Sequence, residues 1–181
     1  MLLKYSFFIF FCTLCLLFGA VAQANEASSS NTIVRFNTNV TLANGASSIS
    51  SFDVELYDHS ASLATRTTPI TVANFLRYIL DDSYSNTLIH RTVSGFVLQG
   101  GGFTWPQVSE VEARGVPLPI LKKAPIVNEA GNSNLFGTIA MAKLSGDPNS
   151  ATSQWFINLA DNLALDDQNE GFTVFGKVIS G

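Results

Sequence analysis

The chain has 181 residues, with ten basic and fourteen acidic side chains, a formal net charge of −4 and 46% hydrophobic residues. This length suits one ordinary domain that can bury a core, and the acidic balance argues against nucleic acid as a partner, because proteins that bind phosphates present a basic face to them. The sequence contains no heptad pattern, internal repeat or metal-ligand cluster, so we expect neither a metal nor a cofactor.

The first 24 residues have the three-part form of a secretory signal peptide. Lys4 precedes an apolar run from Phe7 to Phe18, and Ala22-Gln23-Ala24 forms a small-x-small cleavage site. The apolar run is shorter than the about 20 residues that a membrane span needs, which favours cleavage over an uncleaved anchor. We therefore predict an exported protein, periplasmic where the cell has a periplasm and secreted otherwise.

Cleavage would change the chain in two ways. It would remove both cysteines, Cys12 and Cys15, so that no disulfide could form, and it would leave nine basic and fourteen acidic residues, a net charge of −5. Residues 25–31 are polar and rich in serine, and we expect this leader to be disordered because it has too little apolar surface to pack. The folded domain is predicted to cover residues 32–181.

The first elements of this domain are predicted to be two strands. Apolar and polar residues alternate over 34–40 and again over 52–57, which is typical of strands with one buried face. Asn44-Gly45 lies between them, so the two strands are expected to form an antiparallel hairpin with a long connection.

A helix is predicted to follow the hairpin. Thr68 is placed as its N-cap and Pro69 at the first helical position, where the missing N–H costs nothing. The next apolar residues recur at helical spacing and form one stripe; they are Val72, Phe75, Leu76 and Ile79. One amphipathic helix should therefore pack on a sheet.

Beyond Asn86 the chain consists of short apolar runs separated by Gly, Pro, Asn and Asp. The runs are Leu88 to His90, Gly95 to Gln99, Gly137 to Ala142, Trp155 to Asn158 and Phe172 to Val178. Such spacing favours a mainly antiparallel barrel or sandwich over a parallel α/β sheet.

The stretch from His90 to Phe103 is the most informative. Read as one strand, it places a cation and an amide on the same face as apolar groups, in the order Arg91, Val93, Gly95, Val97 and Gln99. The alternative is an edge strand that carries Arg91 and Gln99 on its surface. His90 should point away from Arg91 and is interpreted as structural. His59 is expected in a surface turn, and no Gly-x-Ser-x-Gly elbow supports Ser/His/Asp catalysis.

Several motifs resemble those of the cyclophilin family in order, spacing and residue type. They are His90-Arg91, the Gly-Phe-x-x-Gln-Gly-Gly run from Gly95 to Gly101, Gly-Thr-x-x-Met-Ala from Gly137 to Ala142, Ser-Gln-x-Phe-Ile from Ser153 to Ile157, and Val-Phe-Gly-Lys-Val from Val174 to Val178. The resemblance runs from about Val34 to Gly181 and is greatest to the exported bacterial branch.

The resemblance implies a fold. It is a mainly β protein, a closed eight-stranded antiparallel barrel capped by helices, with a proline-binding groove on its outer face. Family members continue past the Gly-Lys-Val strand into a further helix and a closing strand. We therefore expect the sequence ending at Gly181 to be a C-terminal truncation.

The resemblance also assigns roles to single residues. Arg91 matches the catalytic arginine, and Gln99 matches the glutamine that contacts the substrate backbone. Phe96 is assigned both to the catalytic residues and to the apolar pocket around the proline ring. The other residues assigned to this pocket are Val97, Met141, Phe156, Leu165 and Phe172. The remaining substrate-binding positions are Gln154 at the groove's edge and Ala142 and Lys143, whose backbone would hold the peptide.

The implied function is peptidyl-prolyl cis/trans isomerisation of proline-containing segments in exported proteins, by a monomer. Two other functions stay open: a binding module that holds such segments without turnover, and a secreted barrel with a small-molecule cavity. Ala164 and Phe172 stand where many eukaryotic members have tryptophan and histidine, which predicts weak cyclosporin binding. Trp155 should face the side of the sheet opposite to Phe156.

Overall fold

The computed structural model of the chain describes residues 30–41, 47–59, 65–105 and 116–181. The elements in these ranges are β1 (Ile33–Thr41), β2 (Ser47–Leu56), α1 (Pro69–Leu80), β3 (Arg91–Val93), β4 (Val97–Gly100), β5 (Phe103–Thr104), β6 (Leu118–Pro119), β7 (Thr138–Met141), β8 (Trp155–Asn158), the 3-10 helices η1 (Leu163–Asp166) and η2 (Gln168–Glu170), and β9 (Val174–Ser180). The predicted signal peptide, leader residues 25–29 and the Asn44-Gly45 turn lie outside the described residues. Within the described part, no helix has the length and apolar character needed to cross a membrane.

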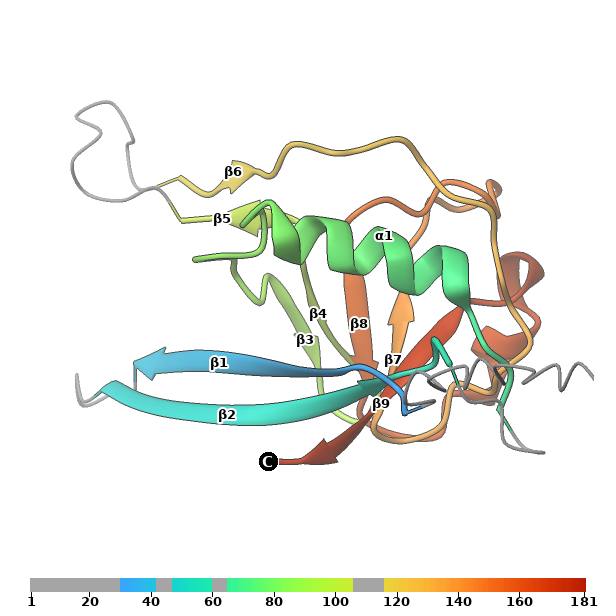
Figure 1. The fold of residues 1–181 in the computed structure, drawn as a ribbon, viewed down its shortest axis with the longest axis horizontal. Coiled ribbons are helices and arrows are strands. Elements are labelled where there is room, and N and C mark those ends of the chain that lie inside the picture. Colours follow the sequence, from blue (N-terminus) through green and yellow to red (C-terminus); the bar gives the residue numbers. More distant parts are fainter. Residues whose placement is uncertain (1–29, 42–46, 60–64, 106–115) are drawn as a thin grey trace, which may run out of the picture.

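Seven strands form one curled antiparallel sheet in the order β1-β2-β9-β7-β8-β4-β3. β5 and β6 form a separate two-stranded ribbon, and α1 covers one face of the main sheet (Figure 1). The predicted mainly β, antiparallel class is confirmed. The closed eight-stranded ring is not formed by the described strands, because β1 and β3 lie at the two ends of the sheet.

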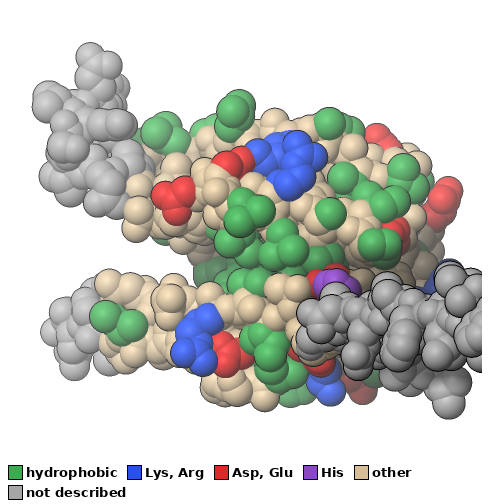
Figure 2. Space-filling model, in the orientation of Figure 1, with side chains coloured by type: hydrophobic (Ala, Val, Ile, Leu, Met, Phe, Trp, Pro, Cys, Tyr) green, Lys and Arg blue, Asp and Glu red, His purple; other side chains and the backbone are tan. Residues whose placement is uncertain are grey.

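The predicted hairpin is confirmed, and its second strand begins earlier than expected. β1 pairs with β2 from Ile33 opposite Glu55 to Thr41 opposite Ser47, so the serines before Phe52 belong to the strand. Phe36 and Phe52 stack across the pair with ring centroids 4.7 Å apart. Figure 2 shows hydrophobic side chains gathered in the hollow between this hairpin and the rest of the molecule.

The predicted helical stripe also packs as expected. Val72 and Phe75 are buried, and Leu76 and Ile79 pack against the same cluster. This main core lies between α1 and one face of the sheet, and its other buried members are Val54, Leu56, Ile139, Met141, Ala151, Trp155, Ile157 and Phe175.

The start of α1 is stabilised by a residue that the sequence pattern does not indicate. Pro69 is the first helical residue and Thr68 precedes it, but the Thr68 side chain makes no capping hydrogen bond. The carboxylate of Glu129 instead accepts hydrogen bonds from the Thr71 N–H at 2.7 Å, the Thr71 hydroxyl at 2.7 Å and the Ile70 N–H at 3.2 Å. A distant carboxylate thus satisfies free N–H groups at the positive end of the helix.

Replacing Glu129 by alanine is expected to lower the free energy of unfolding by about 1–2 kcal/mol, because two N–H groups and one hydroxyl lose a charged acceptor. Urea unfolding followed by circular dichroism measures this change. Asp167→Ala is the control, since its exposed side chain makes no capping bond to the described residues. Equal stability of the two variants would contradict the assigned role of Glu129.

Candidate functional site

The stretch that carries Arg91 and Gln99 is a tight hairpin. β3 and β4 are antiparallel with Arg91 opposite Gln99, and between them Gly95 adopts a φ of 67°, which allows the chain to reverse. The stretch is therefore two strands and not one. Arg91 and Gln99 nevertheless share a face, because they are directly paired across the hairpin.

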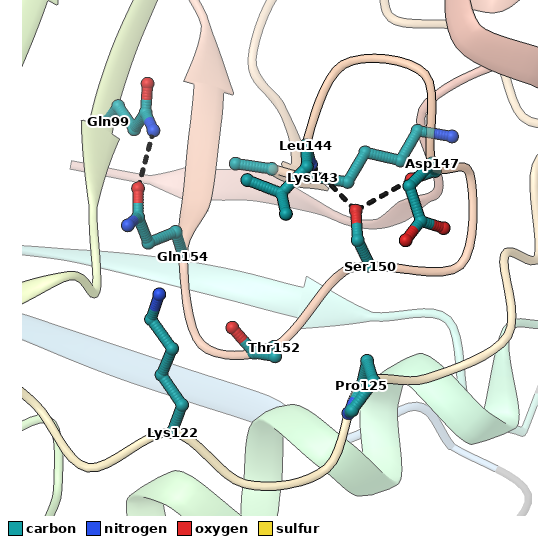
Figure 3. A pocket seen from close by; sticks show the side chains of 10 residues that line it. Gln99, Lys122, Pro125, Lys143, Leu144, Asp147, Ser150, Thr152 and Gln154 are labelled. Atoms are coloured by element: carbon teal, nitrogen blue, oxygen red, sulfur yellow. Dashed lines mark hydrogen bonds between the residues drawn. The ribbon is translucent and has the colours of Figure 1, made fainter.

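Three polar side chains form a row across β3, β4 and the start of β8. Arg91 Nη1 donates to Gln99 Oε1 at 3.3 Å, and Gln99 Nε2 donates to Gln154 Oε1 at 2.9 Å. Figure 3 shows Gln99, on β4, and Gln154, just before β8, pointing toward each other. The Arg91 guanidinium carbon lies 5.6 Å from the centre of the Phe96 ring. The guanidinium is exposed to solvent, so a ligand can approach it.

Five of the six residues predicted to form the apolar pocket come together beside this row. Val97, Phe156 and Leu165 are buried, with 2%, 5% and 6% of their surfaces exposed. Phe96 and Phe172 are partly exposed and pack against them. We call this group, with Tyr57, Ala140, Ala142 and Val174, the site cluster.

Met141 is the exception. It is 1% exposed and belongs to the main core on the other face of the sheet, so the structure does not place it with the predicted pocket. Side chains alternate along a strand: Ala140 is paired with Phe156, whereas Met141 is paired with Trp155. For the same reason Trp155 faces away from Phe156, as predicted.

A cavity of about 370 Å³ lies next to the polar row (Figure 3). Gln99 and Gln154 line one side of it, and the predicted positions Ala142 and Lys143 also line it. Sequence reasoning missed its other residues, which are Lys122, Pro125, Leu144, Asp147, Ser150 and Thr152. Most of them lie in irregular segments, where no periodicity could have assigned them to a site.

The Lys143 side chain is engaged by the turn before β9. Its ammonium donates to the Asn169 carbonyl at 2.7 Å and the Gly171 carbonyl at 2.6 Å, and it lies 5.1 Å from the centre of the Phe172 ring. Burial lowers the pKa of Lys143, while the charge of Glu170 acts in the opposite direction. The Phe172 ring in turn meets Phe156 edge to face, with centroids 5.7 Å apart.

A network of amide side chains lies beside the site cluster. Asn162 Nδ2 donates to the Phe96 carbonyl at 2.9 Å and to Asn158 Oδ1 at 2.8 Å. Asn158 Nδ2 donates to Thr138 Oγ1 at 2.9 Å and to Asn134 Oδ1 at 3.3 Å. Asn134 and Asn158 are fully buried. This amide network therefore ties the turn of the β3/β4 hairpin to the interior.

Asp166 extends the amide network to η1, which also contains Leu165. Its carboxylate accepts hydrogen bonds from Asn134 N and Asn134 Nδ2, both at 2.8 Å, and from Ser133 Oγ at 2.5 Å. Burial acts to raise the pKa of Asp166, but the hydrogen bonds from Ser133 and Asn134 outweigh it, so the pKa lies below its usual value. The group is therefore a charged acceptor at neutral pH.

Neither histidine joins the polar row. His90 packs edge to face on Phe103 at 5.1 Å between ring centroids, and the exposed His59 pairs with Asp58 at 3.0 Å. The described residues contain no group of three or more His, Cys, Asp or Glu side chains that could hold a metal ion. The polar row itself offers an exposed guanidinium and two amides beside an apolar surface.

Comparisons with known proteins identify the family. The family model for cyclophilin-type peptidyl-prolyl cis-trans isomerases matches residues 51–181. A peptidyl-prolyl cis-trans isomerase of Acinetobacter baylyi is 39% identical over 155 residues, which are 83% of this chain and 68% of that protein. Peptidyl-prolyl cis-trans isomerase B of Escherichia coli is 42% identical over 120 residues, 62% of this chain and 66% of that protein.

A solved structure shares the fold. The crystal structure of a cyclophilin-type peptidyl-prolyl cis-trans isomerase of Cryptosporidium parvum, determined in the presence of the dipeptide Ala-Pro, has a TM-score of 0.52 and 23% identity over 81% of this chain and 80% of that one. The two bacterial isomerases are longer than the matched region, which spans about two thirds of each. The chain belongs to the cyclophilin-type peptidyl-prolyl cis/trans isomerase family.

Proposed function

We propose that this chain catalyses cis/trans isomerisation of X-Pro peptide bonds and that Arg91 stabilises the transition state. The observation that carries the proposal is the exposed Arg91 guanidinium, oriented by Gln99 at 3.3 Å, on the same side of the sheet as the site cluster. A proline ring resting on Phe96, Phe156 and Phe172 would bring its nitrogen close to that guanidinium.

The reaction requires such an arrangement for a physical reason. An amide resists rotation because nitrogen donates its lone pair into the carbonyl, which gives a barrier of about 18–20 kcal/mol. Uncatalysed X-Pro exchange therefore takes roughly tens to hundreds of seconds. In the twisted transition state the lone pair returns to nitrogen, which then accepts a hydrogen bond that it cannot accept in the planar ground state.

A donor aimed at that nitrogen binds the twisted form selectively, which is what lowers a barrier. Arg91 supplies the donor, and its hydrogen bond to Gln99 restricts the orientation of the guanidinium. Gln99 and Gln154 would hold the substrate backbone, while the site cluster keeps the ring still as the preceding carbonyl turns. About 7 kcal/mol of such stabilisation would accelerate exchange by roughly five orders of magnitude.

We further propose that the substrates are proline-containing segments of exported proteins. The support is the signal-like sequence of residues 1–24, whose cleavage after Ala24 would leave Asn25 as the first residue. Slow X-Pro isomerisation limits the folding of exported proteins as it does that of other proteins. An exported isomerase would accelerate this step.

The main alternative is a module that binds proline segments without turnover. A protease-coupled isomerisation assay on an Ala-Pro peptide, with binding of the same peptide measured by NMR titration, separates the two functions. The proposal predicts both binding and faster exchange. Binding without faster exchange would support the alternative. Absence of both binding and faster exchange would contradict the isomerase and the binding module alike.

Weak cyclosporin binding is expected from position 164. Ala164 is exposed beside the buried Leu165, so the rim of the site cluster offers no aromatic N–H donor there. Because a buried tryptophan anchor contributes about 2–4 kcal/mol to binding, Ala164→Trp should tighten cyclosporin binding by roughly 30-fold or more. Isothermal titration calorimetry compares the two proteins, with Leu163→Trp as the control on the neighbouring exposed position. Nanomolar binding by the unmodified protein would contradict this expectation.

A further inference from the structure

Lys143 makes three contacts with one short segment. Its Nζ donates to the carbonyls of Asn169 and Gly171, at 2.7 and 2.6 Å, and the same atom lies 5.1 Å from the centre of the Phe172 ring. An ammonium has three N–H donors and no acceptor. Two of its three donors are thus bound to carbonyls, and the charge lies near the electron-rich face of an aromatic ring.

The segment that Lys143 contacts has an unfavourable backbone. Asn169, Glu170 and Gly171 adopt successive φ angles of 55°, 60° and 72°. Two consecutive residues that carry side chains rarely occupy this left-handed region, and such conformations persist only where their surroundings impose them. We call these residues the 169–171 turn.

Other side-chain hydrogen bonds also hold the 169–171 turn. Asn128 Nδ2 donates to the Glu170 and Gly171 carbonyls at 2.8 and 3.0 Å. The Asn169 side chain donates to the Leu144 carbonyl at 2.9 Å and accepts from the Gly146 N–H at 3.1 Å. Among these contacts Lys143 alone brings a charge, and charge-assisted hydrogen bonds are the stronger kind.

The turn leads directly into Phe172, a wall of the site cluster. The Phe172 ring packs edge to face on Phe156, an arrangement that fixes ring orientation as well as burying area. The Phe172 N–H also donates to the Leu165 carbonyl at 3.0 Å. Any movement of the 169–171 turn would therefore move one wall of the surface on which a proline ring would rest.

We propose that Lys143 is a positioning residue: its ammonium fixes the 169–171 turn and thereby holds the Phe172 ring in place for the substrate's proline. This inference rests on the proposed function for the identity of the ligand. It concerns the lysine side chain, whereas the family resemblance assigns only the backbone of this position to substrate. The ring contacts ground state and transition state alike, so its displacement should weaken binding more than it slows turnover.

The first test needs no substrate. NMR spectra of ligand-free protein labelled at phenylalanine should show the Phe172 ring resonances shifted or broadened in Lys143→Met, which keeps the apolar stem and removes the charge. Lys143→Arg should retain the wild-type shifts more closely. Lys177→Met, at an exposed lysine on β9, is the control and should leave them unchanged. Unchanged Phe172 resonances in Lys143→Met would overturn the proposal.

The second test measures function. For an Ala-Pro peptide, Lys143→Met should raise the Kd by about three- to tenfold, the range expected for loss of one oriented aromatic contact, with kcat changed less than twofold. Lys143→Arg should recover most of the affinity. A fall in kcat at constant Kd would point to a general loss of folded protein and overturn the proposal, as would equal Kd values for the Met and Arg variants.

The two proposals can fail separately. If the wild-type protein binds the peptide but does not accelerate exchange, the isomerase proposal fails while the Kd comparison still tests Lys143. If it does not bind at all, the ring resonances of the ligand-free variants still decide whether Lys143 fixes Phe172. Lys143→Gln, a neutral donor, provides a second variant should Lys143→Met fold poorly.

Discussion

Replacing Arg91 by alanine is expected to lower kcat/KM for an Ala-Pro peptide by roughly 10²- to 10³-fold, the usual loss when one donor to a developing charge or lone pair is removed. The effect should fall on kcat, because the hydrogen bond to the prolyl nitrogen forms only in the twisted transition state. Arg91 lies exposed on the short edge strand β3, so its loss should leave the fold intact. The protease-coupled assay, with thermal unfolding beside it, measures both quantities.

Two further variants make this test specific. Arg91→Lys keeps the charge but not the planar set of five N–H donors, so it should recover only a small part of the activity. Arg77→Ala removes an exposed arginine from the last turn of α1 and should retain activity within about twofold, as surface substitutions usually do. If Arg91→Ala had the same kcat as the wild-type protein, the proposed mechanism would be contradicted, whatever the peptide affinity.

The sequence predicted the elements whose pattern is local. Alternation identified the strands that became β1 and β2, and the apolar stripe identified α1, because each signal depends only on which face is buried. The family motifs also indicate Arg91, Gln99 and Phe156 as site residues. They lie on neighbouring strands, and Gln99 on β4 is paired with Arg91 on β3 and with Phe156 on β8.

What the sequence could not predict depends on contacts between distant segments. Glu129 stabilises the start of α1 from 58 positions further along the chain than Thr71, and no local signal marks such a pair. The motif assigns Met141 to the pocket, but in the structure it alternates with Ala140 on β7 and faces the other side of the sheet. Lys143 gave no sign that its side chain reaches the 169–171 turn.

The glycines after Gln99 form a motif that the sequence shows, but the reason for it lies in contacts with a distant segment. That segment contains Ser153 and Trp155. A Cβ at Gly101 would lie 2.5 Å from the Ser153 carbonyl oxygen and 2.8 Å from the Trp155 ring, and Gly101 has a φ of 72°. Close packing of Trp155 against this segment therefore excludes any side chain there, which keeps β4 at its place beside β8.

The amide network connects the buried interior to the predicted proline-binding residues. Asn158 lies on β8 opposite Val97, fully buried, and bonds to Thr138, Asn134 and Asn162. A buried amide of this kind carries a cost unless its donors and acceptor are used, and here Asn158 Nδ2 donates twice while Oδ1 accepts once. Through Asn162 the network reaches the Phe96 carbonyl, next to the residues that would hold the proline.

Asn158→Leu, which keeps the branched shape and removes both polar atoms, is expected to lower the free energy of unfolding by about 3–5 kcal/mol, because three partners, of which Thr138 and Asn134 are buried, lose their hydrogen bonds at once. Asn37→Leu, the same change at an exposed position of β1, should alter it by less than about 0.5 kcal/mol. Urea unfolding measures both. Below the unfolding transition the folded Asn158→Leu protein should also bind an Ala-Pro peptide more weakly, since Asn162, which donates to the Phe96 carbonyl, would lose its hydrogen bond to Asn158. A variant as stable as wild type would show that the amide network does not hold the site together.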